Sequence, residues 1–147
     1  MPLAQHTATE LIARLNAGEL KAVEVTRAYL DIIAERDAEI GAFLSTREES
    51  ALAAAEKIDA RRAAGKPIGI LAGLPIAVKD LLCVQGEATT CASRVLENFQ
   101  PPYNATVVEK LIAADAVLIG KTNMDEFAMG GSCENSGFQV TGNPWDV

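Results

Sequence analysis

A lysine at the end of a short apolar stretch is the first residue whose position suggests chemistry. The stretch is residues 73–80, which read GLPIAVKD. With the two-residue period of a strand, Leu74, Ile76 and Val78 share one face. Lys79 falls on the other face at the carboxyl end, where most lysines simply reach water. If the surroundings instead exclude water, the pKa of such a lysine falls and its neutral amine can act as a base.

Two later stretches are rich in the small and polar side chains that often line a site. The first is a run of about 25 residues after Asp80 that lacks clear periodicity and contains TTCAS at 89–93. The second is SCENSGFQVTGNPWDV at 132–147. Long ordered loops inside compact domains are usually functional, so both stretches are candidates for the lining of a site.

The residue inventory excludes several kinds of chemistry. His6 is the only histidine, so neither a histidine-dependent triad nor a histidine-bearing zinc site can be assembled from this chain. The three cysteines form no CxxC motif, and their odd count indicates reduced thiols. The sequence also lacks GxxxxGK[ST] and GxGxxG, so no known phosphate-binding motif is present.

Length and charge limit the function classes further. A chain of 147 residues is enough for one domain with a substantial core. The net charge of −7 argues against a nucleic-acid surface, because phosphate binding needs clustered lysine and arginine. No apolar run approaches the roughly 20 residues of a membrane span, and the start resembles no secretory signal. We therefore expect a cytoplasmic protein without membrane contact.

A helical layer is predicted for about residues 1–65. Thr7 and Glu10 have the spacing of a capping box, which indicates a short helix that Gly18 ends. A second helix is predicted over about 22–40, where apolar residues recur at helical spacing. No good N-cap residue precedes this second helix.

The transition from helices to sheet is predicted near residue 66. Ser45 and Glu48 again have capping-box spacing, which predicts a third helix over about 48–64. An α/β core is then expected over about 66–147, and its sheet is predicted to begin only near Leu74.

The second half has the pattern of a strand–helix–strand crossover. Asn104 or Thr106 caps a predicted helix, and the unbroken apolar run at 116–121 is typical of a strand covered on both faces. A crossover of this kind implies parallel strands and a right-handed connection. Asn123 and Glu126 have the spacing to cap one more short helix. The predicted fold class is α/β: an N-terminal helical layer, then the first strands of a mixed, largely parallel sheet flanked by helices.

Several long motifs resemble the amidase signature family. They are GLPIAVKD at 73–80, TTCASRVLENFQPPYNATVVEKL at 89–111, GKTNMDEFAMGGSCENSGF at 120–138, and NPWD at 143–146. Within the family, TTCAS, LENF followed by PPY, NMDEFAMG, and ENS followed by NPWD are most similar to the A subunits of aspartyl/glutamyl-tRNA amidotransferases. The resemblance implies that residues 1–147 are the N-terminal part of a single amidase domain, with an incomplete amidase signature fold.

The resemblance also implies a Ser–cisSer–Lys triad, in which a neutral lysine relays a proton through one serine to activate a second as nucleophile. Lys79 matches the family's lysine. Gly130, Gly131 and Ser132 match a turn that lines the substrate pocket, and Met129 matches a position beside the bound amide. No metal is implied. Both triad serines lie beyond NPWD in the family, so we expect this chain to hold the base without the nucleophile and to be inactive alone.

The partners implied by the resemblance are the B and C subunits of a heterotrimer. Glutamine would be hydrolysed on the A subunit, and the ammonia would amidate misacylated Glu-tRNA(Gln) in an ATP-dependent step of protein biosynthesis. ATP and Mg²⁺ would be bound through a partner subunit, with no cofactor in this chain. Two alternatives stay open: a stand-alone amidase acting on a small amide, and a truncated, inert chain that retains at most a helical surface for partners.

Overall fold

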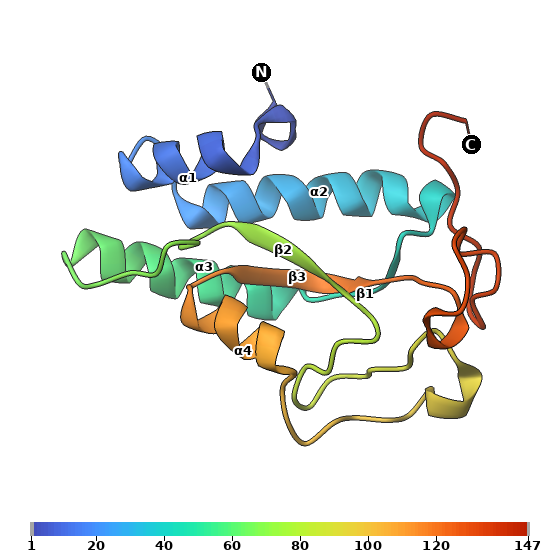
Figure 1. Cartoon of the computed structure of the whole chain (residues 1–147). Coiled ribbons are helices and arrows are strands. Elements are labelled where there is room, and N and C mark those ends of the chain that lie inside the picture. The colour runs from blue at the N-terminus through green and yellow to red at the C-terminus, as the bar shows by residue number, and fades with distance from the viewer. Residues whose placement is uncertain (1, 147) are drawn as a thin grey trace. The chain divides into compact units, whose positions relative to one another are not determined.

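The computed structural model describes residues 2–146 (Figure 1). The described part contains four α-helices, three strands and three short 3₁₀ helices. In chain order these are η1 (Leu3–Gln5), α1 (Ala8–Asn16), α2 (Ala22–Ile40), β1 (Phe43–Thr46), α3 (Glu48–Ala63), β2 (Pro75–Lys79), η2 (Arg94–Leu96), α4 (Thr106–Ala113), β3 (Val117–Thr122) and η3 (Glu126–Ala128). No helix in this part of the chain combines the length and the apolar character needed to cross a membrane.

The chain forms two compact units, each assembled from separate stretches of sequence. The first unit consists of the residues up to Ala34 together with Arg47–Ile76 and Lys110–Ile119. The second consists of Glu35–Thr46, Ala77–Glu109 and the residues from Gly120 onward. Both units therefore bring together residues that are far apart in the sequence.

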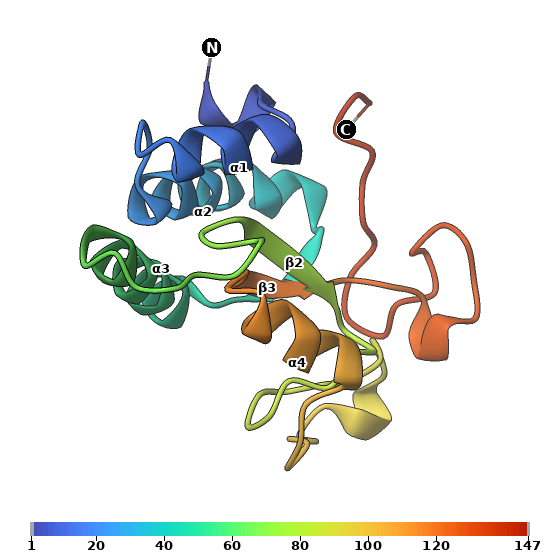
Figure 2. The ribbon, with the colours of Figure 1, turned by 60° about the vertical axis from the view of Figure 1, so that its left-hand side comes forward.

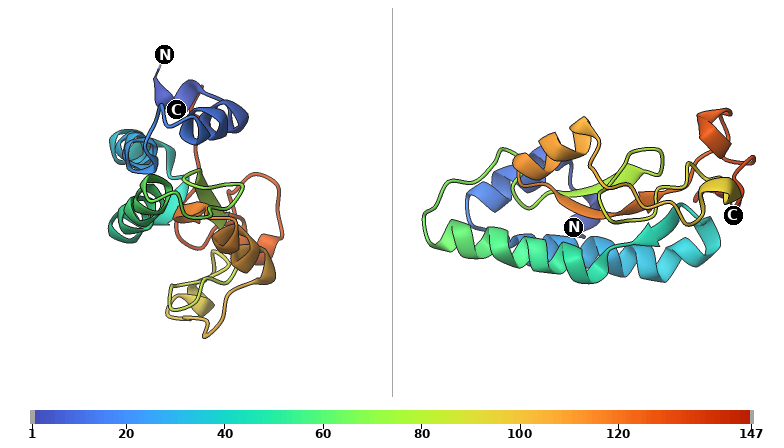
Figure 3. Two further views of the ribbon diagram at one scale, coloured as in Figure 1. Left: turned by 90° about the vertical axis from the view of Figure 1, so that its left-hand side faces the viewer. Right: turned by 90° about the horizontal axis from the view of Figure 1, so that it is seen from below.

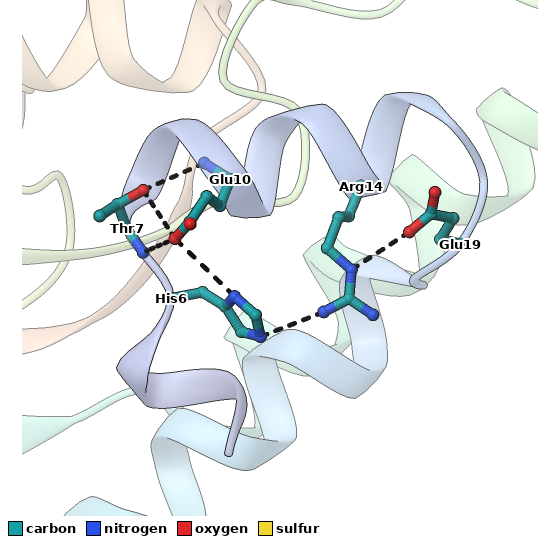
Figure 4. A network of polar contacts seen from close by, with 5 residues as sticks. All are labelled: His6, Thr7, Glu10, Arg14 and Glu19. Carbon is teal, nitrogen blue, oxygen red and sulfur yellow. Dashed lines mark hydrogen bonds and ion pairs between the residues drawn. The ribbon is translucent and has the colours of Figure 1, made fainter. Parts of the chain in front are cut away.

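The predicted capping box at the start of α1 is confirmed (Figure 4). The Thr7 hydroxyl accepts a hydrogen bond from the Glu10 backbone N–H at 3.3 Å, and the Glu10 carboxylate accepts from the Thr7 N–H at 2.8 Å. These hydrogen bonds lower the pKa of Glu10. The His6 ring lies between the Glu10 carboxylate and the Arg14 guanidinium, at 3.8 and 3.1 Å, so α1 begins inside a small polar network.

The core of the first unit lies between its helices and β3. Val117 and Ile119 alternate along β3 and belong to this core, whereas Leu118 between them does not. Figure 3 shows α3 on one face of the strands in this unit and the end of α4 on the other, and Figure 2 agrees. Both faces of the strand are therefore covered. The buried apolar residues of this core are Leu11, Leu15, Ala22, Val25, Leu30, Ala51, Ala55, Ile58, Ala72, Leu74, Val117 and Ile119.

The three strands form one sheet in the order β1–β3–β2. The parallel pairing of β2 with β3 follows from two backbone hydrogen bonds. Val117 N–H donates to the Leu74 carbonyl at the start of both strands, and Asp80 N–H donates to the Thr122 carbonyl at their ends. The predicted α/β fold, with a parallel crossover through α4, is confirmed.

The strand β1 was not expected from the sequence. It pairs antiparallel with β3, with Ser45 opposite Lys121 and Thr46 opposite Gly120. The prediction that Ser45 caps the third helix is therefore wrong, and so is the prediction that the sheet begins only near Leu74. The residue before α3 is Arg47, whose side chain makes no capping hydrogen bond.

The helix predicted after Asn123 is also absent. The Asn123 side-chain amide donates to the Gln139 carbonyl and the Thr141 hydroxyl, both at 2.9 Å, so it is committed to the later loop. Only the short 3₁₀ helix η3 forms there. The helix α4 does form and begins at Thr106. Asn104 does not cap it, because its side-chain oxygen accepts from the Gln85 N–H at 2.8 Å.

Candidate active site

Lys79 is the last residue of β2 and its side chain is exposed. The predicted alternation holds, since Val78 is buried while Ala77 and Lys79 on the other face are exposed. Within residues 2–146 the Lys79 ammonium has neither an ion pair nor a hydrogen bond. The described residues therefore leave this amine free to meet a reacting group, and they do not by themselves exclude water from it.

Asp80, the next residue, is 2% exposed and is held at every polar atom. Its backbone N–H donates to Thr122, and its carbonyl accepts from the Cys91 N–H. One carboxylate oxygen accepts from the N–H and the hydroxyl of Thr90 and from the Ala92 N–H. The other lies 3.2 Å from the Lys121 ammonium. The chain is thus fixed immediately beside Lys79.

Lys121 of β3 is 1% exposed, which makes it the largest fully buried side chain in the described part. Its ammonium donates to the Leu82 carbonyl at 2.8 Å and to the Thr89 hydroxyl at 3.0 Å, and it pairs with Asp80. An ammonium has three donors, and all three are used here, which is the arrangement expected of a charged buried lysine. The two lysines thus differ: Lys121 is fully paired and buried, and Lys79 is unpaired and exposed.

Sequence reasoning did not identify Lys121 as a site residue. The available signal was a cation at the end of an apolar strand, AVLIGK, next to the parallel strand that ends in Lys79. Such a cation must find buried acceptors, which the TTCAS stretch and Asp80 provide.

The TTCAS stretch joins the end of β2 to the turn at η3. Cys91 N–H donates to the Asp80 carbonyl, and the Cys91 carbonyl accepts from the Phe127 N–H at 2.9 Å. The buried Ser93 hydroxyl donates to the Glu126 carboxylate at 2.6 Å. These contacts bring the loop after β2 and the segment after β3 side by side in the second unit.

Left-handed backbone conformations gather at this junction. Cys91 and Ala92 have φ of +52° each, and Phe127 and Ala128, which follow across the hydrogen bond, have φ of +52° and +61°. Residues with a Cβ rarely adopt this region, at a cost of about 1–3 kcal/mol each, and such residues cluster at functional sites. The junction thus has the backbone character of a site.

A cavity of about 230 Å³ lies in the second unit beside Asp80 and Thr90. Glu97 and Phe138 contribute to its wall, together with Leu44, Ser45, Ala88 and Gln139. The buried charges of Asp80 and Lys121 thus lie next to a hollow in the same unit.

The predicted pocket residues 129–132 follow η3 and are exposed, with Met129 at 76%. Their turn is organised by Asp125, whose carboxylate accepts from the backbone N–H groups of Ser132, Cys133 and Asn135. The hydrogen bonds from Asn135 and Cys133 lower the pKa of Asp125. Asp125 was not predicted as a site residue, although it lies inside the NMDEFAMG motif.

Gly130 packs directly against Asp125, because a Cβ at that position would overlap the carboxyl group. Gly131 next to it has open space around it. The structure therefore assigns a close backbone approach to one of the two glycines. It brings Lys79 and the 129–132 turn into the same compact unit through Asp80, Cys91 and η3, with no direct contact between them.

The sheet, its crossover and this junction define a mixed α/β enzyme fold of the amidase class. The amidase family model matches residues 24–147, and the chain belongs to the amidase family.

Similar proteins carry a narrower name. The chain is 54% identical over 142 residues to the glutamyl-tRNA(Gln) amidotransferase A subunit of Rhodopirellula baltica, covering 97% of this chain and 28% of that protein. The crystal structure of the corresponding A subunit from Thermotoga maritima is 34% identical with a TM-score of 0.76, covering 98% of this chain and 28% of that one. The chain thus spans less than a third of the length of these relatives.

One further solved structure is more similar in backbone. It belongs to a vestigial protein complex that bears on the evolutionary origins of an s-triazine catabolic enzyme. Its TM-score is 0.91 at 39% sequence identity, and the match covers 96% of this chain and 31% of that one. The amidase fold over this segment is therefore common to proteins with different names.

Proposed function

We propose that this chain is the N-terminal part of the glutamine-hydrolysing A subunit of a glutamyl-tRNA(Gln) amidotransferase. The observation that carries the proposal is the 54% identity to a protein of that name over 97% of this chain. The free amine of Lys79, fixed in place by Asp80, is the group that the chemistry needs.

In the proposed reaction Lys79 is the base. Its neutral amine takes a proton through a bridging serine, and the deprotonated nucleophilic serine attacks the amide carbon of glutamine. The tetrahedral oxyanion is stabilised by backbone N–H groups and collapses, so that the C–N bond breaks and ammonia leaves with the proton. Water then cleaves the acyl-enzyme to glutamate. Met129, Gly130, Gly131 and Ser132 are proposed to line the pocket for the amide.

The remaining steps are assigned to partners. The B and C subunits would complete the complex, and the ammonia would pass to misacylated Glu-tRNA(Gln) in a step that uses ATP and Mg²⁺ on a partner subunit. Residues 2–146 hold no group of three metal-ligating side chains that could bind a metal ion, and no step of the proposed hydrolysis runs through one. We propose a cytoplasmic location for the assembly.

The test is hydrolysis of glutamine by the natural protein, purified with the subunits that accompany it. Lys79→Ala is expected to lower kcat/KM by roughly 10²- to 10⁴-fold, the usual range for loss of a positioned base. Lys66→Ala, which removes another exposed lysine, is the matched control and should leave kcat/KM unchanged. Equal activity of wild type and Lys79→Ala would refute the proposal.

A second candidate is a stand-alone amidase, favoured by the higher TM-score of the s-triazine-related structure. Its signature would be hydrolysis of small amides, with no ammonia transfer when the B and C subunits and tRNA are supplied. The 147-residue chain alone is proposed to be inactive. Turnover by that chain, abolished by Lys79→Ala, would overturn the proposal that it is inactive alone.

A further inference from the structure

Asp80 and Lys121 form a buried ion pair that the reaction proposed above does not use. The pair is 3.2 Å apart, with side-chain exposures of 2% and 1%. Burial of an unpaired charge is costly, so each member depends on the other to remain ionised. All three Lys121 donors have acceptors, two of which, Leu82 and Thr89, belong to the loop that follows β2.

The pair adjoins Lys79 along the chain. Asp80 is its covalent neighbour, and the hydrogen bonds from Thr90 and Ala92 fix the orientation of the Asp80 carboxylate. An isolated carboxylate in this position would favour the ammonium form of Lys79, because an adjacent anion stabilises a cation. The Lys121 ammonium next to that carboxylate largely cancels its field.

We infer that Lys121 is a positioning residue: it holds Asp80 and neutralises its charge, so that Lys79 loses its proton more readily and can act as the base. The inference rests on the proposed function for its catalytic meaning. The electrostatic relationship among the three residues can be measured without any activity.

Other titratable groups lie around the pair. Cys91 interacts electrostatically with both Asp80 and Lys121, and Cys83 is close to Cys91. Glu97 lines the cavity that Asp80 also lines. These groups are unchanged in the variants below, so a shift between the variants reports the pair.

The experiment measures the titration of the Lys79 amine in the natural protein. Competitive acylation with a small reagent, read by peptide mass spectrometry from about pH 6 to about pH 11, gives the midpoint for this one lysine. Lys66 in the same sample is the internal control. The pH dependence of kcat/KM for glutamine is recorded in parallel.

Lys121→Met leaves Asp80 uncompensated and is expected to raise the Lys79 midpoint by about one pH unit. Asp80→Asn leaves Lys121 uncompensated and should lower it by a similar amount. The double variant restores neutrality and should return to within about 0.3 unit of wild type. Lys121→Arg, which keeps the charge, should not move it. The acid-side midpoint of kcat/KM should follow the same order.

Opposite shifts in the two single variants and their cancellation in the double variant support the inference. A purely structural role would lower kcat/KM at every pH with an unmoved midpoint, and that result overturns it. If Lys121→Met does not fold, Asp80→Asn and the double variant decide in the same way. Shifts in a protein that hydrolyses no glutamine would refute the proposed function alone, and glutaminase activity lost in Lys79→Ala without any shift would refute this inference alone.

Discussion

The carboxylate of Asp59 caps the helix α2 at Ala22, where Oδ1 accepts the backbone N–H at 2.8 Å. The second oxygen accepts from the Val23 N–H at 3.1 Å. Asp59 lies in α3, 37 residues further along the chain. The first turn of α2 therefore receives from a neighbouring helix the acceptor that its own sequence lacks.

Loss of this cap should destabilise the first unit. Asp59→Ala removes both acceptors, and we expect the free energy of unfolding to fall by about 1–2 kcal/mol. Urea denaturation followed by far-UV circular dichroism measures the change. The control is Asp31→Ala, which removes an exposed carboxylate on α2 and should change stability by less than about 0.5 kcal/mol. Equal effects of the two variants would contradict the capping role.

Local motifs predicted local structure well, and non-local contacts explain the failures. The capping box at Thr7 and Glu10 needs only residues three apart, and it formed as expected. Ser45 and Glu48 have the same spacing, yet Ser45 pairs with Lys121, 76 positions away, in the sheet. A pattern within four residues cannot register such a partner, so the strand β1 was missed.

The candidate site divides in the same way. Lys79 was identified because its motif resembles a family, and nothing in the described surroundings marks it apart from its lack of a partner. Lys121 and Asp125 were missed because their importance depends on burial and on loop hydrogen bonds. Those properties arise only when the stretch at 89–93 and the turn at 130–135 have folded around them.

The ion pair between Asp115 and Arg61 should make stability depend on pH. Asp115 accepts both guanidinium hydrogen bonds, at 2.7 and 2.8 Å, and these lower its pKa from the ordinary value of 3.8. The folded state then keeps the carboxylate ionised at a pH where the unfolded chain binds a proton. The contribution is complete above the unfolded pKa and is lost as the pH falls through the folded pKa.

The variant Asp115→Asn removes this titration and tolerates the φ of +62° at that position. The stability difference between wild type and variant should be constant above about pH 5 and shrink below about pH 4. Denaturation curves across this range test it. A difference that does not change with pH would show that the pair contributes nothing through Asp115 ionisation.

The two adjacent glycines of the predicted pocket should respond differently to alanine. At Gly130 a Cβ would overlap the Asp125 carboxyl group, whereas at Gly131 nothing lies within 4 Å. Gly130→Ala should therefore cost about 1–3 kcal/mol of stability or displace the turn that Asp125 organises. Gly131→Ala is the matched control and should be close to neutral. Thermal unfolding and the KM for glutamine measure both effects, and equal results for the two variants would contradict the assignment.

Cys91 lies at the junction and offers a test against a thiol nucleophile. Burial raises the pKa of its thiol from the ordinary value of 9.0, and Asp80 adds to the rise. Near neutral pH the thiol therefore stays protonated and is a poor nucleophile. Alkylation by iodoacetamide should be slow at neutral pH and increase only in the alkaline range.

The corresponding variant is Cys91→Ser, because serine keeps the small polar side chain at a position with a φ of +52°. If a serine carries the nucleophilic oxygen and Lys79 the proton, Cys91→Ser should retain amide hydrolysis within about threefold of wild type, whereas Lys79→Ala loses roughly 10²- to 10⁴-fold. A loss in Cys91→Ser as large as that in Lys79→Ala would instead assign the chemistry to the thiol. The base would then act on a sulfur, and the serine-based reaction would have to be abandoned.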